Sequence, residues 1–267
     1  MNPPLLLVTR PQPQADEWVA ALSAFGVNAA TLPLLVIEDG PDPAAVVQAW
    51  GGVARHDLVM FVSPNAVERF MAARPVNASS ALWPAATLAG STGPGTAHAL
   101  LAAGVPAAQI VSPLADPGQF DAEALWAQLQ TRRDWAGASA LVVRGEGGRD
   151  WLAETLRAAG AAVGFVAAYR RVLPQWSAAQ QAVLAHALAR PAEHRWLFSS
   201  SQALGHLATL APGADWSASA ALATHPRIAA SAQRAGFASV QQVAPSLRAV
   251  AQAVRPALTP SIQSPPP

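Results

Sequence analysis

The sequence contains neither cysteine nor lysine. Without Cys, a disulfide scaffold, thiolate chemistry and a Cys-ligated metal are all excluded. Without Lys, Schiff-base catalysis and a phosphate-binding loop lysine are excluded. All 17 basic residues are therefore Arg, whose planar guanidinium groups suit bidentate binding of carboxylates. Charged residues make up 12% of the chain, about half the usual share of about 25%.

Strong net charge and long apolar runs are also absent. The net charge is +1, which favours neither nucleic acid nor an anionic membrane as a partner. No apolar run approaches the roughly 18 residues of a membrane span, and residues 1–13 do not resemble a secretory signal. Most of the histidines lack a partner at metal-ligand spacing. We expect a soluble, cytoplasmic protein without a metal or cofactor.

The sequence instead contains an internal repeat. Arg10 corresponds to Arg144 and Gly26 to Gly160 at a single offset, and two further blocks recur in the same order. The paired blocks are 8–26 with 142–160, 60–66 with 197–203, and 93–105 with 225–237. Three similar blocks in the same order indicate a duplicated α/β unit, and so two similar lobes with a cleft available between them.

Short apolar runs alternate with helical patterns along both copies. Strands are expected at 5–9, 31–37, 57–62, 87–91, 140–143, 163–172, 196–199 and 221–224. Helices are expected at 14–25, 64–71, 94–103, 120–129, 150–159, 178–188, 201–210 and 227–235. This alternation predicts an α/β fold of two similar, doubly wound parallel-sheet domains. The Pro-rich residues 258–267 are expected to be a disordered tail.

The turns that leave the strands are small, hydroxylated or rich in Gly, as in Ser63-Pro64-Asn65 and Gly93-Pro94-Gly95. In doubly wound folds, ligands bind beyond the carboxyl ends of the strands, and helix N-termini there favour anions. Such serines also serve as plain helix N-caps, so each turn alone has a purely structural alternative. Recurrence of the same turns in both copies favours an anion site.

Two classes of function compete at this point. The run Arg144-Gly145-Glu146-Gly147-Gly148 suggests a nucleotide-dependent Rossmann enzyme, although the full glycine motif with its later acidic residue is missing. Two lobes lined by anion-binding turns also fit a non-catalytic, two-lobed protein that binds small anions. Such binding proteins usually carry a signal segment, which we do not find at the start of this chain.

Seven ordered motifs resemble the uroporphyrinogen-III synthase family. No single motif is diagnostic, but the set spans roughly residues 5–254. The motifs are Val8-Thr9-Arg10-Pro11, Pro33-Leu34-Leu35-Val36-Ile37, Phe61-Val62-Ser63-Pro64-Asn65-Ala66-Val67, Gly93-Pro94-Gly95-Thr96-Ala97, Arg144-Gly145-Glu146-Gly147-Gly148-Arg149, Tyr169-Arg170-Arg171 and His225-Pro226-Arg227-Ile228-Ala229. At Arg227-Ile228 the chain departs from relatives that have hydroxyl residues there.

The resemblance implies a discontinuous domain arrangement. One domain would comprise residues 1–36 and 173–257, and the other residues 39–166. Residues 31–39 and 165–174 would cross between them as an antiparallel pair of linker strands. Two short crossings would make a hinge that permits variable opening. We expect a monomer.

The resemblance also implies a reaction. Hydroxymethylbilane, a linear tetrapyrrole, would lose water, close through a spiro intermediate and give uroporphyrinogen III with ring D inverted. No cofactor is implied, and a transient contact with the preceding pathway enzyme is possible. Tyr169, the only Tyr in the chain, matches the family's tyrosine and would donate a proton to the departing hydroxyl. The alternative is that this ring only packs at a linker.

A polycarboxylate substrate requires backbone amides and guanidinium groups. The expected substrate-binding residues are Arg10, Ser63, Pro64, Asn65, Ala66, Gly93, Gly95, Thr96, Arg144, Gly145, Arg149, Ser200, Ser201, Gln202 and Arg227. For any one of the arginines, a solvated or structural role is the alternative.

Overall fold

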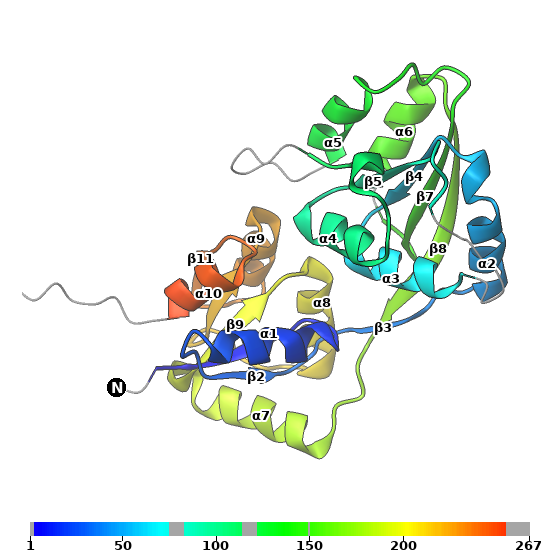
Figure 1. Cartoon of the computed structure of the whole chain (residues 1–267). Coiled ribbons are helices and arrows are strands. Elements are labelled where there is room, and N and C mark those ends of the chain that lie inside the picture. Colours follow the sequence, from blue (N-terminus) through cyan, green and yellow to red (C-terminus); the bar gives the residue numbers. More distant parts are fainter. Residues whose placement is uncertain (1–2, 75–82, 114–121, 149, 255–267) are drawn as a thin grey trace, which may run out of the picture. The chain divides into compact units, whose positions relative to one another are not determined.

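A computed structural model describes residues 3–74, 83–113, 122–148 and 150–254. The Pro-rich tail and Arg149 therefore lie outside the described residues. Contacts within the chain divide it into two units. Their segments can be followed in Figure 1 by colour, which runs along the sequence. Unit 1 comprises Met1–Val36 and Val172–Pro267, and unit 2 comprises Ile37–Arg171.

Unit 1 is built on a five-stranded sheet with the order β11-β10-β9-β1-β2. Its strands are β1 (Leu5–Val8), β2 (Ala29–Thr31), β9 (His194–Phe198), β10 (Ala220–Ala223) and β11 (Ser239–Gln242). All four neighbouring pairs are parallel. Numbered within the unit, this is the doubly wound order 2-1-3-4-5, which reverses between β1 and β9.

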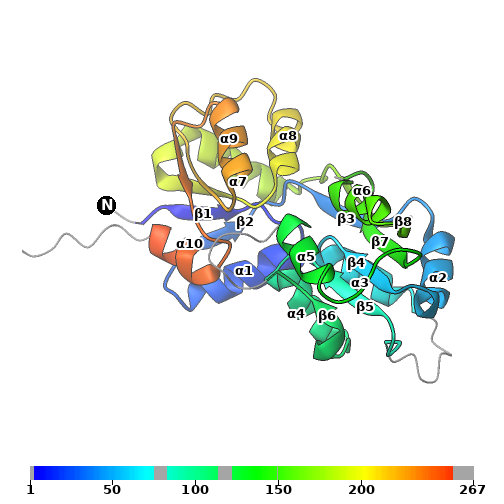
Figure 2. The same cartoon turned by 90° about the horizontal axis from the view of Figure 1, so that it is seen from above.

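Five α-helices cover this sheet. They are α1 (Gln14–Ser23), α7 (Ala178–Ala189), α8 (Ser201–Leu210), α9 (Pro226–Arg234) and α10 (Leu247–Val254), with a short 3-10 turn η3 at Pro191–Glu193. In Figure 2, α1 and α10 lie on one side of β1 and β2, and α7, α8 and α9 lie on the other. On the first side, Leu22 of α1 and Val250 of α10 pack against Leu6 and Val8 of β1.

Unit 2 is built on a six-stranded sheet with the order β3-β8-β7-β4-β5-β6. Its strands are β3 (Val36–Asp39), β4 (Leu58–Phe61), β5 (Leu88–Ser91), β6 (Ile110–Val111), β7 (Ser139–Gly145) and β8 (Ala162–Val172). The pairs among β4 to β8 are parallel. If β7 is counted first, these five strands have the same 2-1-3-4-5 order as unit 1, and the order reverses between β7 and β4.

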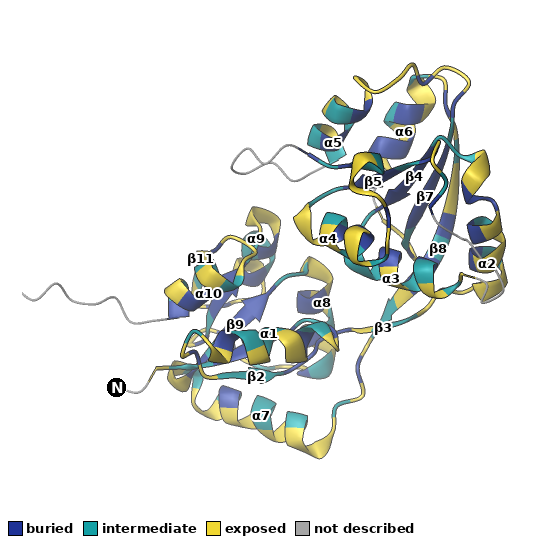
Figure 3. Ribbon diagram, in the orientation of Figure 1, coloured by how far each residue is buried: buried dark blue, intermediate teal, exposed yellow. Residues whose placement is uncertain are grey.

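The helices of unit 2 are α2 (Pro43–Gly51), α3 (Pro64–Ala72), α4 (Pro94–Ala102), α5 (Ala122–Leu129) and α6 (Trp151–Ala158), with 3-10 turns η1 (Val53–Arg55) and η2 (Ala107–Gln109). Val59 and Phe61 of β4 pack toward α2, α3 and α4, whereas Leu58 and Met60 pack toward α5 and α6. Because successive side chains alternate between two covered faces, every residue of β4 is buried, as Figure 3 shows for this strand.

The structure confirms the α/β fold class predicted from the repeat. The corresponding strands β1 and β7, β9 and β4, and β10 and β5 occupy equivalent positions in their sheets. Some element limits differ from those predicted. Residues 32–35 separate β2 from β3 rather than continuing one strand, and no element had been assigned to α2, β6, β11 or α10.

Candidate functional site

The carboxyl ends of the strands bring the predicted turns together within each unit. In unit 2 the turns after β7, β4 and β5 leave neighbouring strands, and the strand order reverses between β7 and β4. Pro64 lies in the first turn of α3 and Gly95 in that of α4, and a Cβ added at Gly95 would lie 3.7 Å from Pro64 Cγ. Pro64, Asn65, Gly93 and Gly95 are all at least partly exposed at this end of the sheet.

Ser63 is the N-cap of α3. Its Oγ accepts a hydrogen bond of 3.2 Å from the amide of Ala66, and Pro64 follows at the first helical position. Ala66 and Thr96 are buried, Thr96 with 4% of its surface exposed. We conclude that Ala66 and Thr96 serve packing within unit 2, since neither side chain is open to solvent.

Tyr169 lies at the end of β8 and is fully buried, with 0% of its surface exposed. Its phenol oxygen is 3.0 Å from Ser63 Oγ and accepts a hydrogen bond from the guanidinium of Arg171. The same guanidinium lies 4.9 Å from the centre of the Tyr169 ring. The tyrosine therefore belongs both to the core and to a polar chain that reaches the turn before α3.

Gly145 leaves room for this tyrosine. A Cβ at Gly145 would lie 2.7 Å from Cζ of Tyr169, which is closer than real Cβ contacts allow. Gly147 and Gly148 instead have positive φ angles of 72° and 144°, which favour glycine in the turn. The glycine cluster at 145–148 thus follows from packing and backbone conformation, which removes the main support for a Rossmann nucleotide site.

Arg144 forms an ion pair with Asp150, and its guanidinium carbon lies 4.3 Å from the centre of the Phe165 ring. Its charge is therefore already neutralised within its own unit. Arg149, the other arginine predicted in this turn, lies outside the described residues.

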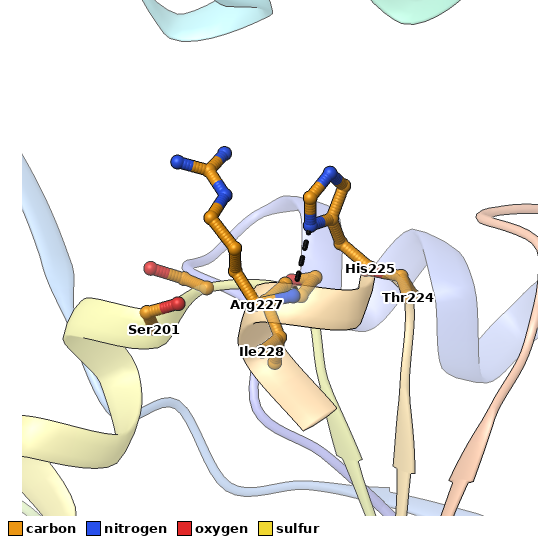
Figure 4. A pocket seen from close by; sticks show the side chains of 7 residues that line it. Ser201, Thr224, His225, Arg227 and Ile228 are labelled. Atoms are coloured by element: carbon orange, nitrogen blue, oxygen red, sulfur yellow. Dashed lines mark hydrogen bonds between the residues drawn. The ribbon is translucent and has the colours of Figure 1, made fainter. Parts of the chain in front are cut away.

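In unit 1, the turns after β9 and β10 form an open pocket of about 390 Å³ at the N-termini of α8 and α9. It is lined by Ser199, Ser200, Ser201, Thr224, His225, Arg227 and Ile228. Figure 4 shows the Arg227 side chain and the His225 ring extending to the same side, with His225 Nδ1 accepting a hydrogen bond of 3.1 Å from the Arg227 amide.

Two helix N-termini and an exposed guanidinium thus face this pocket. Within the described chain, no side chain caps α8, although Ser200 occupies its N-cap position. Gln202 lies in the exposed first turn of the same helix but is not among the lining residues. The pocket is suited to bind an anion such as a carboxylate.

Arg10 follows β1 at the point where the strand order of unit 1 reverses. Its guanidinium carbon lies 4.1 Å from the centre of the Trp18 ring, and its Nε is buried without a hydrogen-bond partner among the residues that the structure describes. Burial lowers the pKa of Arg10 to about 10, so the group remains charged at neutral pH. Unlike Arg144, this arginine has no carboxylate partner among the described residues, so its charge is available to an anionic ligand.

Some residues of these sites were not among the predicted substrate-binding residues. Ser199 and Thr224, in the turns that leave β9 and β10, line the pocket of unit 1, and Trp18 lies against Arg10. Arg171 was quoted only as part of a motif, although its spacing of two from Tyr169 along a strand places both on one face.

The described residues contain no group of three or more His, Asp or Glu side chains that could hold a metal ion. No helix in the described part of the chain is long and apolar enough to cross a membrane.

Comparisons with known proteins agree with these features. The family model described as uroporphyrinogen-III synthase HemD matches residues 16–252. The uroporphyrinogen-III synthase of Salmonella typhimurium is 33% identical over 181 residues, which cover 68% of this chain and 70% of the relative. That of Escherichia coli is 29% identical over 178 residues, covering 67% and 69%.

Solved structures show the same fold. A mutant uroporphyrinogen III synthase from Thermus thermophilus matches with a TM-score of 0.58 at 19% identity, covering 93% of this chain and 96% of that one. The enzyme from Helicobacter pylori 26695 matches with a TM-score of 0.56 at 17% identity, covering 94% and 100%. The family match and the Salmonella relative show the family as well as the fold. They do not favour a nucleotide-dependent enzyme or an anion-binding protein. This chain belongs to the uroporphyrinogen-III synthase family.

Proposed function

We propose that this protein is a cyclising lyase that converts hydroxymethylbilane into uroporphyrinogen III in tetrapyrrole biosynthesis. The observation that carries this proposal is the family match over residues 16–252, supported by the Salmonella relative. The anion-binding turns of both units fit a linear tetrapyrrole that bears many carboxylates.

The chemistry requires little beyond binding and proton transfer. The C–O bond of the hydroxymethyl group breaks, water departs, and the pyrrole nitrogen supplies the electrons that form an azafulvene. The substituted carbon of ring D attacks this electrophile, and the resulting spiro-pyrrolenine rearranges so that ring D is inverted. Since the substrate also closes unaided to the uninverted isomer, the protein must chiefly hold a flexible chain in the conformation that favours the spiro route.

The carboxylates would bind at the strand ends. In unit 1, Arg10 contributes a guanidinium without a carboxylate partner among the described residues, and Ser200, Ser201 and Arg227 contribute the pocket at α8 and α9. In unit 2, the turns at 63–66 and 93–96 contribute backbone amides at the starts of α3 and α4. Arg144 would act on the substrate only if its pair with Asp150 were broken.

Tyr169 is the proposed source of the proton for the departing hydroxyl. Its phenol takes part in a hydrogen-bond chain that ends at the partly exposed Ser63, which supports a role in proton transfer. We further propose that the protein acts in the cytoplasm as a monomer, and that it makes a transient contact with the enzyme that supplies hydroxymethylbilane.

The decisive experiment supplies freshly made hydroxymethylbilane and separates the isomers by chromatography. We expect the type III isomer in excess, whereas buffer alone gives the type I isomer. An isomer distribution identical to that in buffer would refute the proposed function.

A matched pair of variants tests the pocket of unit 1. Arg227→Gln should raise KM about tenfold, because a charged hydrogen bond contributes about 1.5 kcal/mol. Arg234→Gln removes the same charge from the other end of α9, where Arg234 bonds Ser231, and should leave KM unchanged. Equal effects of the two variants would show that only net charge matters.

A further inference from the structure

Arg171, Tyr169 and Ser63 form a hydrogen-bond chain that begins at a group able only to donate. A guanidinium has donors but no acceptor, so Arg171 donates to the phenol oxygen of Tyr169. Among the described residues, Ser63 Oγ, 3.0 Å away, is the one partner of this buried phenol that can accept its hydrogen, so we assign the phenol as the donor. The chain therefore runs from Arg171 through Tyr169 to Ser63.

Ser63 can only donate at the far end of this chain. A hydroxyl group accepts two hydrogen bonds and donates one. Its two acceptor positions are taken by the Tyr169 phenol and by the amide of Ala66, which lies 3.2 Å away. The hydrogen of Ser63 is thus left for an acceptor outside the chain.

Burial determines which of these groups a substrate can reach. Tyr169 is completely buried, and its ring packs directly against the backbone of Gly145. Ser63 is partly exposed and lies at the start of α3, where the strand order of unit 2 reverses. The phenol therefore reaches a substrate only through the serine.

We propose that Ser63 is the group that protonates the departing hydroxyl, and that Tyr169 acts through it. This inference rests on the proposed function. As the C–O bond breaks, the leaving oxygen keeps the electron pair and takes the proton of Ser63, so that water departs. Ser63 takes the phenol proton of Tyr169 at the same time.

The phenolate that remains is stabilised by the adjacent guanidinium of Arg171, which stays protonated. When the new macrocycle regains its aromatic pyrroles, it releases one proton, which returns to Tyr169 through Ser63. The reaction then yields uroporphyrinogen III and water with no net change in the protein. Arg171 is a positioning residue in this scheme, because it acts only through the phenol.

The other half of the repeat lacks this chain. Ser200 corresponds to Ser63 but makes no cap hydrogen bond, as far as the described residues show. The position that corresponds to Tyr169 by the offset between Arg10 and Arg144 is Leu35, a buried apolar residue. The proposal therefore assigns proton transfer to unit 2 alone.

The first test needs no turnover. Because the chain has one Tyr, a label at the tyrosine ζ-carbon gives a single NMR resonance. Arg171→Met and Ser63→Ala should each shift that resonance, since each removes a partner of the phenol oxygen. Asp42→Ala removes the N-cap of α2 in the same unit and should leave it in place. An unmoved resonance in both Arg171→Met and Ser63→Ala would show that the chain does not exist in solution.

The second test is a double-variant cycle on the rate of type III formation. Ser63→Ala and Tyr169→Phe should each lower kcat about 100-fold with little change in KM, as expected for loss of a general acid. The double variant should fall no further, because the two groups act as one unit. Ser63→Thr and Arg171→Lys, which keep a hydroxyl and a donor, should recover most of the rate lost in Ser63→Ala and Arg171→Met.

The outcomes separate the two proposals. If the wild-type protein makes no type III isomer, the proposed function fails, while the NMR test still decides whether the chain exists. If the wild type is active and Ser63→Ala keeps its full kcat, Ser63 is not the donor. Independent, multiplying effects of Ser63→Ala and Tyr169→Phe would also overturn the inference.

Discussion

Replacing Arg10 with Met should make the protein more stable while weakening substrate binding. Each unit of pKa corresponds to about 1.4 kcal/mol. Because burial lowers the pKa of Arg10 from its usual range to about 10, burying this charge costs on the order of 3 kcal/mol. Since the folded-state pKa lies below the unfolded value, the cost is present in full at pH 7. It is relieved only as the pH rises through about 10.

The contact with Trp18 offsets part of this cost. A guanidinium over an indole ring at 4.1 Å contributes about 1 kcal/mol. Met keeps an apolar chain of similar length against the ring and carries no charge. The net gain in the free energy of unfolding should therefore be about 2 kcal/mol, which raises the melting temperature of a domain of this size by about 4–8 °C.

Calorimetry at pH 7 in a buffer of low salt measures this change, and Arg144→Met is the matched control. Arg144 pairs with Asp150, and loss of a half-exposed ion pair should lower stability by about 1 kcal/mol or less. Added citrate, a small polycarboxylate, should stabilise the wild type more than Arg10→Met. A lower melting temperature in Arg10→Met would refute the argument that Arg10 is a costly, unpaired charge kept for a ligand.

Two further changes test the packing and the electrostatics of unit 2. Gly145→Ala should lower the free energy of unfolding by about 1–3 kcal/mol in urea titrations, because its Cβ would meet the ring of Tyr169 at 2.7 Å. Gly51→Ala, with open space around the added Cβ, should not destabilise the protein, and equal losses would disprove the steric explanation. The pKa of Asp57 is lowered, first by a hydrogen bond from the Ser139 amide, so its stabilisation is lost as the pH falls through its folded-state pKa. Asp57→Asn should therefore weaken the loss of stability in acid, followed by fluorescence, and an unchanged acid profile would contradict this.

Much of the fold could be predicted because its determinants are local. The apolar run Leu58–Phe61 is a strand buried on both faces, and the Ser63-Pro64 pair starts a helix, as the sequence indicates. The helices Pro43–Gly51 and Leu247–Val254 were not predicted. Asp42 and Ser246 cap their first turns and were the available signals, but neither helix belongs to a block of the repeat.

The site was less predictable because its properties depend on distant parts of the chain. Arg10 and Arg144 are equivalent in sequence, and each is followed six residues later by an aspartate. Only Arg144 forms an ion pair with it, whereas Asp16 accepts a hydrogen bond from Gln12 instead. The depth of Tyr169 depends on Gly145 and on the helices that cover the sheet, so its complete burial could not be read from its own segment. Sequence alone thus predicts candidate residue types and the edge of the sheet where they lie, but not which of these groups have partners within the protein.

The connection of the two sheets has a consequence for biosynthesis. Strand β1 pairs with β9, while the contiguous segment Ile37–Arg171 lies between them in the sequence. At roughly 5–20 residues per second, the ribosome makes residues 194–198 roughly ten to forty seconds after β1. The inserted unit can therefore fold first. During that time the apolar run Leu5–Val8 lacks its neighbouring strand β9 and can aggregate or bind a chaperone. Slow translation upstream of His194 should for this reason lower the yield of native protein more than slow translation after it.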